Sequence, residues 1–281
     1  MLRYRILNVF TREGDRLSGN PLCVFEDGSA LDDATMQALA LQLNLSETTF
    51  LLPPTRPEAT ARVRIFTPTF EMPFAGHPTL GTAEVVRALH GGDTHVLEMA
   101  AGLVPVTAAG STWTLRTAHA PVTRAVQATR AELAAMLSLP VDATREAGWV
   151  DTGAEQLVFR LASVEAVNAI RPDPLLLARH GWSEKRREAM VYAWAHASPT
   201  EIVARFFFVQ HGAVIEDPAT GSACANLGGW HASRGQRDVT LHVRQGERVG
   251  RPSDLRLRVD AEGAIFVGGD VIELGEGVLR L

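Results

Sequence analysis

Four side chains that can hold or move a proton lie in three short motifs. Glu47 lies in NLSETTF, His77 in AGHPT, and Asp217 and Ser222 in EDPATGS. A carboxylate such as Glu47 acts as a general acid and base where its surroundings raise its pKa. Each carboxylate also has a plainer interpretation, Glu47 as a residue that supports a turn and Asp217 as the opening of an Asp-Pro turn. The residue types alone leave both interpretations open.

An internal repeat contains two of these motifs. The segments EMPFAGH (71–77) and EDPATGS (216–222) share the frame E-x-P-x-x-G and stand 145 positions apart, about half of the 281-residue chain. A fainter match pairs GNPLCVF (19–25) with GAEQLVF (153–159). The repeat predicts two copies of one α+β unit, facing each other across a pseudo-twofold axis.

The flanks of the two E-x-P-x-x-G segments also match. A strand-like segment with Arg-x-Phe precedes each of them, at 64–66 and at 205–207. A helix-like segment follows each and ends at a glycine, Gly91 or Gly235. Glycine just past the end of a helix is the expected terminator, so the repeat unit includes a strand, a turn and a helix.

The repeat places His77 and Ser222 at equivalent positions, just before their helices. Serine is a favoured N-cap, and the glycine before each residue lets other groups approach the backbone closely. A helix start presents free N–H groups, so two such starts would hold a small anion, most simply a carboxylate. Ordinary capping is the alternative. Asp217 has Met72 as its repeat partner, and this asymmetry makes the acid a candidate for function.

Apolar periodicity predicts many strands and few helices. The predicted strands are 2–10, 21–25, 48–52 (stopped by Pro53 and Pro54), 61–66, 95–107, 112–118, 155–161, 189–195, 205–210, 238–243, 254–260 and two at the C-terminus, AIFVGGDVIEL and VLRL. The predicted helices are 32–43, 77–92, 163–170, 173–181 and 222–235. Without regular βαβ alternation, this pattern is typical of an α+β fold. The pattern lapses at 119–128, so we expect domains at 1–118 and 119–281, with chain termini able to cross between them.

Composition excludes several classes of protein. The net charge is −5, whereas a nucleic-acid binder needs a basic face. No window approaches the about 20 apolar residues of a membrane helix, and the N-terminus does not read as a signal peptide, so we expect a cytoplasmic protein. The only lysine, Lys185, lies in the charged stretch SEKRRE, which we expect to be solvent-exposed. Pyridoxal phosphate chemistry needs a lysine in a pocket, which argues against that class.

Metal, phosphate and thiol chemistry find little support. The nine histidines include no HExxH motif, and GHPTLGT (76–82) lacks the lysine of a phosphate loop. Cys23 and Cys224 suggest a two-thiol racemase, whose thiols should occupy equivalent positions. The repeat partner of Cys224 is Thr79, however, and Cys23 lies in another element. Both cysteines are therefore interpreted as small buried hydrophobes.

The motifs GNPLCVF, NLSETTFLLPP, RIFTPTFEMPFAGHPTLGTA, IEDPATGSACANLGGW and QGERVGRPS resemble, in this order and spacing, the PhzF-like phenazine-biosynthesis family. The resemblance runs from about residue 5 to the C-terminus. It implies the diaminopimelate epimerase fold, two pseudo-symmetric domains that are each a strand-rich half-barrel around a central helix, with the active site between them. It also implies a cofactor-free isomerase that, like the trans-2,3-dihydro-3-hydroxyanthranilate isomerase of this family, moves a proton between two ring carbons.

The resemblance also implies roles for single residues. The catalytic glutamate of the family falls on Glu47, its active-site histidine on His77, and its aspartate and serine on Asp217 and Ser222. The backbone at Gly76 and at Thr220 and Gly221 would hold the carboxylate of a small substrate. No cofactor or metal is expected, nor a nucleic-acid or membrane partner, and a homodimer is common in the family. The separate roles of His77 and Asp217 stay open.

Two alternatives remain beside the isomerase. The first is a two-thiol amino-acid epimerase that uses Cys23 and Cys224. The second is a non-catalytic protein that binds a small ligand or a partner on the same fold. The substrate itself depends on pocket residues outside the motifs.

Overall fold

A computed structural model describes residues 1–210 and 212–281. The chain forms two compact units, Met1–Arg116 together with Gly268–Leu281, and Thr117–Val267. The sequence analysis placed the division between 118 and 119 and allowed the termini to cross. The two strands expected at the C-terminus form one long strand, β18 (Ile265–Leu279), most of which belongs to the first unit.

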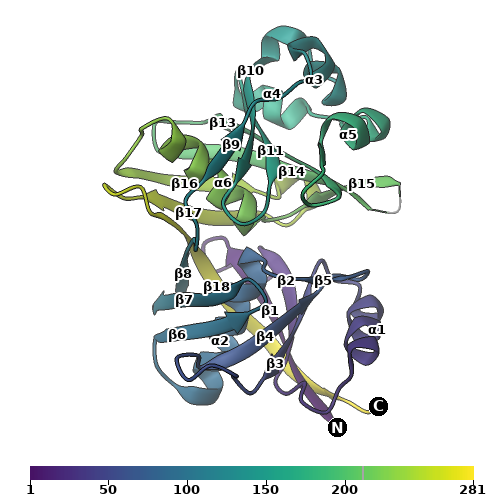
Figure 1. The fold of residues 1–281 in the computed structure, drawn as a ribbon, viewed down its shortest axis with the longest axis vertical. Coiled ribbons are helices and arrows are strands. Elements are labelled where there is room, and N and C mark those ends of the chain that lie inside the picture. The colour runs from purple at the N-terminus through teal and green to yellow at the C-terminus, as the bar shows by residue number, and fades with distance from the viewer. Residues whose placement is uncertain (211) are drawn as a thin grey trace. The chain divides into compact units, whose positions relative to one another are not determined.

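The first unit is a curved set of strands around one helix (Figure 1). Its strands are β1 (Leu2–Thr11), β2 (Asn20–Phe25), β3 (Thr48–Leu52), β4 (Ala61–Phe66), β5 (Glu71–Met72), β6 (Thr94–Met99), β7 (Gly102–Ala109), β8 (Thr112–Arg116) and the main part of β18. Its helices are α1 (Asp33–Leu43) and α2 (Gly76–His90). β2 runs parallel to β3, β3 antiparallel to β4, and β4 parallel to β6.

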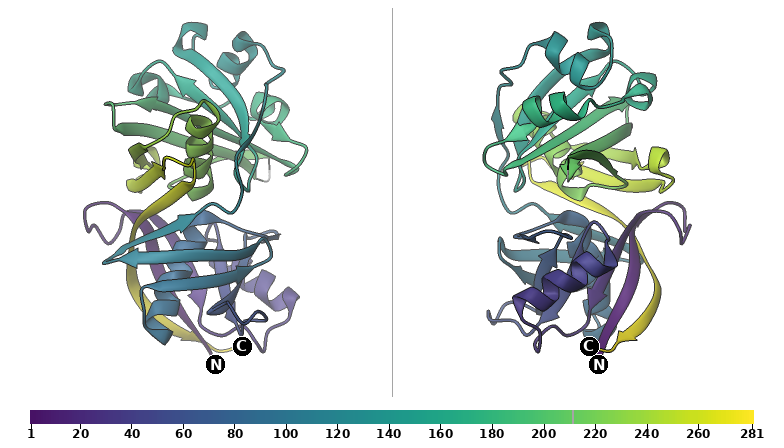
Figure 2. Two further views of the ribbon diagram at one scale, coloured as in Figure 1. Left: turned by 60° about the vertical axis from the view of Figure 1, so that its left-hand side comes forward. Right: turned by 90° about the vertical axis from the view of Figure 1, so that its right-hand side faces the viewer.

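The two helices of this unit lie on opposite faces of its strands. α2 contacts β1, β2, β6 and β8, whereas α1 lies on the outside, as the right-hand view of Figure 2 shows. Alternation along β2 explains both faces, because successive side chains of a strand point to opposite sides. Leu22 meets α2 at Gly81, and Cys23 and Phe25 pack in a core cluster with Met36 of α1.

Local sequence signals set the ends of both helices. Asp32 is the N-cap of α1, where its carboxylate accepts a hydrogen bond from the Thr35 backbone N–H at 2.8 Å. α2 carries Pro78 in its first turn, where a missing N–H costs nothing, and it ends at Gly91 with φ 72°. The predictions of helices at 32–43 and 77–92 are therefore confirmed to within a residue or two.

The second unit repeats this arrangement. Its strands are β9 (Val122–Arg124), β10 (Thr144–Asp151), β11 (Gln156–Leu161), β12 (Trp182–Ser183), β13 (Glu188–His196), β14 (Glu201–Gln210), β15 (Ala213–Asp217), β16 (Val239–Gln245) and β17 (Ser253–Val259). Its helices are α3 (Arg130–Met136), α4 (Val164–Ala169), α5 (Pro174–His180) and α6 (Gly221–Ser233), with short 3₁₀ turns at Val141–Ala143 and Glu247–Val249. α6 is the central helix (Figure 1).

The order of strand pairing is the same in the two units. β11 runs parallel to β13, β13 antiparallel to β14, and β14 parallel to β16, which matches β2, β3, β4 and β6. α2 and α6 occupy the same place in this order, each after a short antiparallel strand. The predicted α+β fold, two pseudo-symmetric diaminopimelate epimerase-like domains with a central helix each, is confirmed.

The repeat also appears in single side chains. Arg64 donates to both carboxylate oxygens of Glu71, at 2.7 and 2.6 Å, and lies 5.0 Å from the centre of the Phe66 ring. Arg205 makes the same pair with Glu216, at 2.9 and 2.6 Å, and lies 4.7 Å from the Phe207 ring. In each unit the arginine of the Arg-x-Phe motif and the glutamate of the E-x-P-x-x-G motif thus form an ion pair. This pair links β4 to β5 in the first unit and β14 to β15 in the second.

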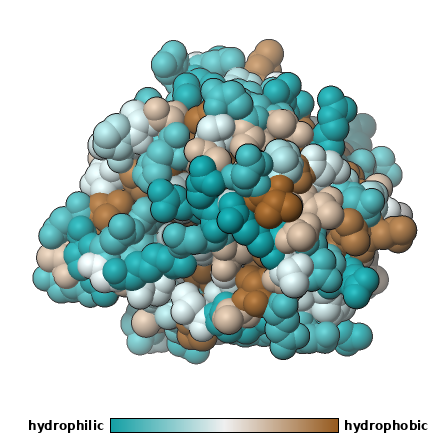
Figure 3. Space-filling model, turned by 90° about the horizontal axis from the view of Figure 1, so that it is seen from above, coloured by the Kyte–Doolittle hydropathy of each residue, from teal (hydrophilic) through white to brown (hydrophobic). Residues whose placement is uncertain are grey.

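Three further observations concern a helix that the sequence analysis did not predict, one face of the molecule and the length of the helices. The sequence analysis missed α3, which begins with a capping box between Thr129 and Glu132. Figure 3 shows that the face seen from above is largely hydrophilic, with hydrophobic side chains scattered over it. Within 1–210 and 212–281, none of the helices is both long and apolar enough to cross a membrane.

Candidate active site

Glu47 and His77 come together at the start of α2. Glu47 directly precedes β3, and His77 is the second residue of α2. Glu47 Oε2 lies 3.5 Å from His77 Nε2, and the two side chains are 15% and 5% exposed. The strand and the helix are joined nearby by a hydrogen bond of 2.8 Å between the hydroxyls of Thr49 and Thr82. Side chains two positions apart along an extended segment point to the same side, and Thr49 points to α2. The carboxylate of Glu47, two positions earlier, therefore also lies on the side of α2.

Burial keeps the His77 ring neutral. It lowers the pKa of His77 from 6.5 to about 3, although the ring donates to the backbone carbonyl of Pro21, which acts in the opposite direction. His77 Nδ1 lies 3.4 Å from Asn20 Nδ2, and Asn20 Oδ1 accepts from the Ser46 hydroxyl at 3.2 Å. A neutral imidazole next to a carboxylate can position it or exchange a proton with it, but it brings no positive charge at neutral pH.

The two helix starts differ from the expectation in one respect. α2 begins at Gly76 and α6 at Gly221, so His77 and Ser222 lie inside the first turn and not before it. Ser222 is therefore not an N-cap, because glycine adopts the helical conformation here and Thr220 takes the extended cap position. Neither Ala75 nor Thr220 caps its helix through a side chain. The early N–H groups of both helices are thus left to bind other acceptors, as an anion site requires.

Asp217 and Thr220 form a compact polar group before α6. The Thr220 hydroxyl donates to Asp217 Oδ2 at 2.5 Å, and both residues are buried. The amide of Gln245, on β16, donates to the Asp217 backbone carbonyl at 2.9 Å and to the Thr220 hydroxyl oxygen at 3.1 Å. Gln245 is fully buried, and sequence reasoning missed it. These contacts fix the turn that carries Asp217.

Ser222 is held by a second buried amide group. Gln156, at the start of β11, donates to Ser222 Oγ at 3.0 Å, and the Asn226 side chain donates to Gln156 Oε1 at 2.9 Å. Asn226 lies one turn further along α6 and is fully buried. Neither residue was a sequence candidate. The structure therefore brings Glu47 to His77 and, in the second unit, Asp217, Thr220, Gly221 and Ser222 to one helix start.

The two candidate acids, Glu47 and Asp217, lie in different units and at different positions of the repeat. Glu47 precedes Thr48, which pairs with Phe66, and Met190 precedes Val191, which pairs with the equivalent Phe207. Met190 is thus the counterpart of Glu47. Conversely Met72 pairs with Ile65 as Asp217 pairs with Phe206, so Met72 is the counterpart of Asp217. A symmetric fold therefore carries an asymmetric set of acids.

The cysteines lie away from these groups. Cys23 is fully buried in the cluster against α1, on the face of β2 opposite α2, and burial raises its pKa to about 12. Cys224 is also fully buried, and burial raises the pKa of its thiol well above the usual range. Thiols in this state are not nucleophiles or bases at neutral pH, which speaks against the two-thiol alternative.

Metal ligands are not grouped in the part of the chain that the structure describes. No three side chains among its histidines, cysteines, aspartates and glutamates are placed to hold a metal ion together. The polar groups described above are hydrogen-bonded amides, hydroxyls and single carboxylates. Such a set can bind an organic acid and move its protons.

Comparison with known proteins places this chain among the isomerases. An uncharacterized isomerase of Pasteurella multocida is 35% identical over 98% of this chain and 93% of its own. The trans-2,3-dihydro-3-hydroxyanthranilate isomerase of Pseudomonas aeruginosa is 33% identical over 99% of each chain. The structure of a predicted epimerase from the same organism superposes with a TM-score of 0.81, at 30% identity and over the whole of both chains. The protein is an isomerase of epimerase-like fold.

The family follows from a match along nearly the whole sequence. The model of the phenazine biosynthesis-like proteins, PhzC-PhzF, matches residues 7–274. The chain belongs to this family, and the resemblance drawn from the motifs is confirmed.

Proposed function

We propose that the protein is a cofactor-independent isomerase that moves a proton on a small carboxylic acid, with Glu47 as the general acid and base. The observation that carries the proposal is the placement of Glu47 beside neutral His77 at the uncapped start of α2, with Met190 at its counterpart position. A racemase of two bases needs one on each side of a carbon. A shift of a proton between two carbons needs one base that collects and returns it.

The chemistry of the step follows from these groups. The Glu47 carboxylate removes a proton from carbon next to an enoate, and the electrons of the C–H bond move into the conjugated system. The negative charge gathers on the substrate carboxylate, where N–H groups at a helix start stabilise it. The protonated Glu47 then delivers the proton to the second carbon, so that no atom or electron is gained or lost. His77 stays neutral throughout and packs beside the carboxylate.

The first candidate substrate is trans-2,3-dihydro-3-hydroxyanthranilate. The Pseudomonas aeruginosa relative named for its isomerisation aligns with this chain along its whole length, which supports a small cyclic carboxylic acid. Asp217, Thr220, Gly221 and Ser222 are the proposed contacts of the second unit with the substrate. The expected homodimer and the cytoplasmic location stay predictions.

A substrate panel in heavy water tests this proposal. The purified protein is incubated with cyclic and acyclic amino and hydroxy acids, including trans-2,3-dihydro-3-hydroxyanthranilate, and followed by proton NMR. Loss of a carbon-bound proton signal together with a new product supports the isomerase. Saturable binding of a panel member without any exchange would contradict it and favour the non-catalytic binding protein. A thermal-shift titration of the same panel supplies the binding arm.

A further inference from the structure

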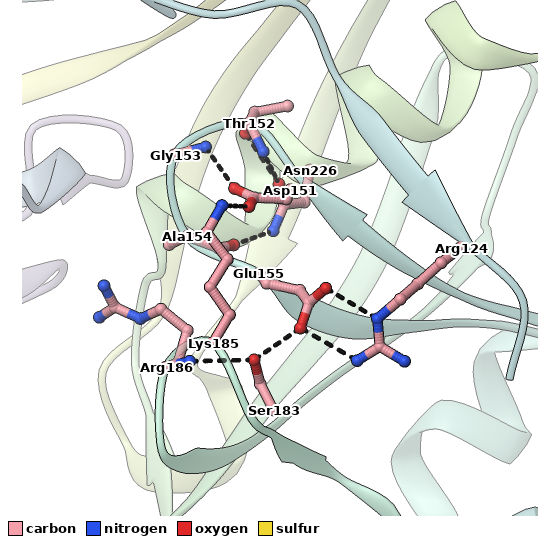
Figure 4. A network of polar contacts seen from close by, with 10 residues as sticks. All are labelled: Arg124, Asp151, Thr152, Gly153, Ala154, Glu155, Ser183, Lys185, Arg186 and Asn226. Carbon is pink, nitrogen blue, oxygen red and sulfur yellow. Dashed lines mark hydrogen bonds and ion pairs between the residues drawn. The ribbon is translucent and has the colours of Figure 1, made fainter. Parts of the chain in front are cut away.

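Ser222 stands at the end of a chain of buried amide groups. The backbone N–H and the hydroxyl of Thr152 donate to Asn226 Oδ1 at 2.9 and 2.8 Å, and Asn226 Nδ2 donates to the Ala154 carbonyl at 2.7 Å. Asn226 Nδ2 also donates to Gln156 Oε1, and Gln156 Nε2 donates to Ser222 Oγ. Figure 4 shows the first part of this chain, with Asn226 reaching toward both Thr152 and Ala154. Asn226 is 0% and Gln156 2% exposed, so water does not compete.

Backbone groups fix the direction of this chain. A backbone N–H only donates and a backbone carbonyl only accepts, so Thr152 and Ala154 together determine which end of the Asn226 amide is oxygen. Asn226 must then present its N–H to Gln156, which turns Gln156 Oε1 toward Asn226 and Gln156 Nε2 toward Ser222. The usual ambiguity of amide orientation does not arise, because each link dictates the next.

The turn that supplies these backbone groups is itself held in place. Asp151 accepts a hydrogen bond from the Gly153 N–H at 2.8 Å and forms an ion pair with Lys185. Glu155 accepts from Arg124 at 2.8 Å and from the Ser183 hydroxyl at 2.6 Å. Figure 4 shows these contacts on both sides of the turn between β10 and β11. The turn from which this series of hydrogen bonds starts is therefore held by residues of the second unit.

The direction of these hydrogen bonds has a consequence for Ser222. Its oxygen accepts the Gln156 N–H, so its own O–H must donate elsewhere. The structure, over the residues that it describes, gives this O–H no protein acceptor. We propose that Gln156 and Asn226 are positioning residues that make Ser222 a hydrogen-bond donor to an oxygen of the substrate. This inference rests on the proposed function, in which Ser222 contacts the substrate.

The repeat shows that the fold does not need this amide chain. In the first unit the counterparts of Gln156 and Asn226 are Leu22 and Gly81, by the match of β2 with β11 and of α2 with α6. These two are in apolar contact, since a Cβ at Gly81 would lie 2.5 Å from Leu22 Cδ2. The same junction is therefore apolar in one unit and a directed polar chain in the other. Buried amides in place of a simple apolar contact indicate a role beyond packing.

A donor at Ser222 also selects the group that it binds. The O–H that remains available donates to a carboxylate or carbonyl oxygen, and such a contact leaves the hydrogen bond from Gln156 in place. The buried amides Gln156 and Asn226 thus favour a substrate that presents an acceptor oxygen to the Ser222 hydroxyl. A hydrogen bond to a charged group contributes enough to change turnover about ten- to a hundredfold.

The kinetics of a double-mutant cycle test whether Gln156 donates its hydrogen bond to Ser222. Gln156→Glu keeps the acceptor for Asn226 but offers Ser222 an acceptor in place of a donor, so the O–H turns inward and is lost to the substrate. We expect kcat/KM for trans-2,3-dihydro-3-hydroxyanthranilate to fall about ten- to a hundredfold. Gln156→Met, which removes the donor without reversing it, should cost less. In the Ser222→Ala background Gln156→Glu should add no further loss.

An equal loss from Gln156→Glu in both backgrounds would overturn the proposal, because a charge or a packing defect acts without Ser222. Unchanged kcat/KM in Gln156→Glu would overturn it as well. Thermal unfolding of each variant shows whether the fold is kept.

A second measurement needs no substrate and separates this inference from the proposed function. Side-chain amide protons of Gln156 and Asn226 are followed in ¹H–¹⁵N spectra of the wild type and of Ser222→Ala. Donation from Gln156 Nε2 to Ser222 predicts that a Gln156 Hε2 resonance moves upfield while those of Asn226 remain in place. An unmoved Gln156 resonance would refute the direction of the chain. If the wild type turns over none of the panel, the proposed function fails, and this spectrum still decides the amide chain.

Discussion

His77 Nε2 lies 3.5 Å from Glu47 Oε2, at the junction of β3 and the first turn of α2. At this distance the two atoms form no hydrogen bond, so the neutral ring lies beside the carboxylate without neutralising it. Helix α2 fixes the imidazole and strand β3 fixes the carboxylate, and the bond between Thr49 and Thr82 joins the two elements. The two elements that position the proposed base, β3 and α2, both belong to the first unit.

The buried His77 predicts an acid-sensitive fold. The folded chain takes up a proton on His77 only near pH 3, whereas the unfolded chain does so near 6.5. Between these values the unfolded state binds more protons, so the free energy of unfolding falls as the pH is lowered. From pH 7 to pH 5 this site alone should remove about 2 kcal/mol.

Urea unfolding at pH 7 and pH 5 measures this dependence. His77→Gln should shrink the difference between the two pH values by about 2 kcal/mol, because glutamine does not titrate. The same change at His119, which is exposed, is the control. A His77→Gln variant with the full wild-type difference would show that the ring is not buried in its neutral form.

The two arginine–glutamate pairs should differ in their contribution to stability. Arg205 and Glu216 are 11% and 10% exposed, and Arg205 also donates to the carbonyls of Val167 and Ile170. Glu216→Gln leaves a buried guanidinium without its counter-charge and should cost about 3 kcal/mol.

Glu71→Gln is the matched control for this change, with an expected cost of about 1 kcal/mol or less. Glu71 is 36% exposed, and Arg64 keeps a second partner, Asp33, at 2.6 Å. Chemical denaturation of both variants gives the two free energies of unfolding. Equal losses would show that burial does not separate the two copies of the pair.

The two thiols should be unreactive in the folded protein. Both are fully buried, and burial raises the pKa of each. A thiol reagent at pH 8 should label neither cysteine until denaturant is added, and then both. Cys23→Ala and Cys224→Ala should each keep isotope exchange into a confirmed substrate. Loss of exchange in both variants, with the fold intact, would revive the two-thiol epimerase.

Much of the fold follows from local signals in the sequence. Pro78 and Gly91 frame α2, and the repeated E-x-P-x-x-G motif predicts the duplication that the strand pairing confirms. α3 escaped notice because the segment before it lacks apolar periodicity. Its capping box at Thr129 and Glu132 is nevertheless a readable helix start.

The details of the site are less accessible to sequence reasoning. Glu47 and His77 are 30 positions apart, and nothing local fixes their distance. The buried amides Gln156 and Asn226 lack a motif, since their partners are backbone groups of a turn. The repeat did hold one signal, because it aligns them with Leu22 and Gly81. Where one copy of a duplicated fold has a polar residue and the other has an apolar residue at the equivalent position, the two copies are expected to differ in function.

Hydrogen–deuterium exchange by Glu47→Gln tests the central claim most directly. The variant, the wild type and Glu58→Gln, a change at an exposed loop carboxylate, are incubated in heavy water with trans-2,3-dihydro-3-hydroxyanthranilate or whichever panel acid the wild type converts. Glu47 as the proton carrier predicts product with the wild type and Glu58→Gln, deuterated to the extent that the Glu47 carboxyl proton exchanges with solvent before delivery. It also predicts that Glu47→Gln loses turnover by at least about a hundredfold with the fold unchanged. Exchange at the wild-type rate in Glu47→Gln would contradict the account.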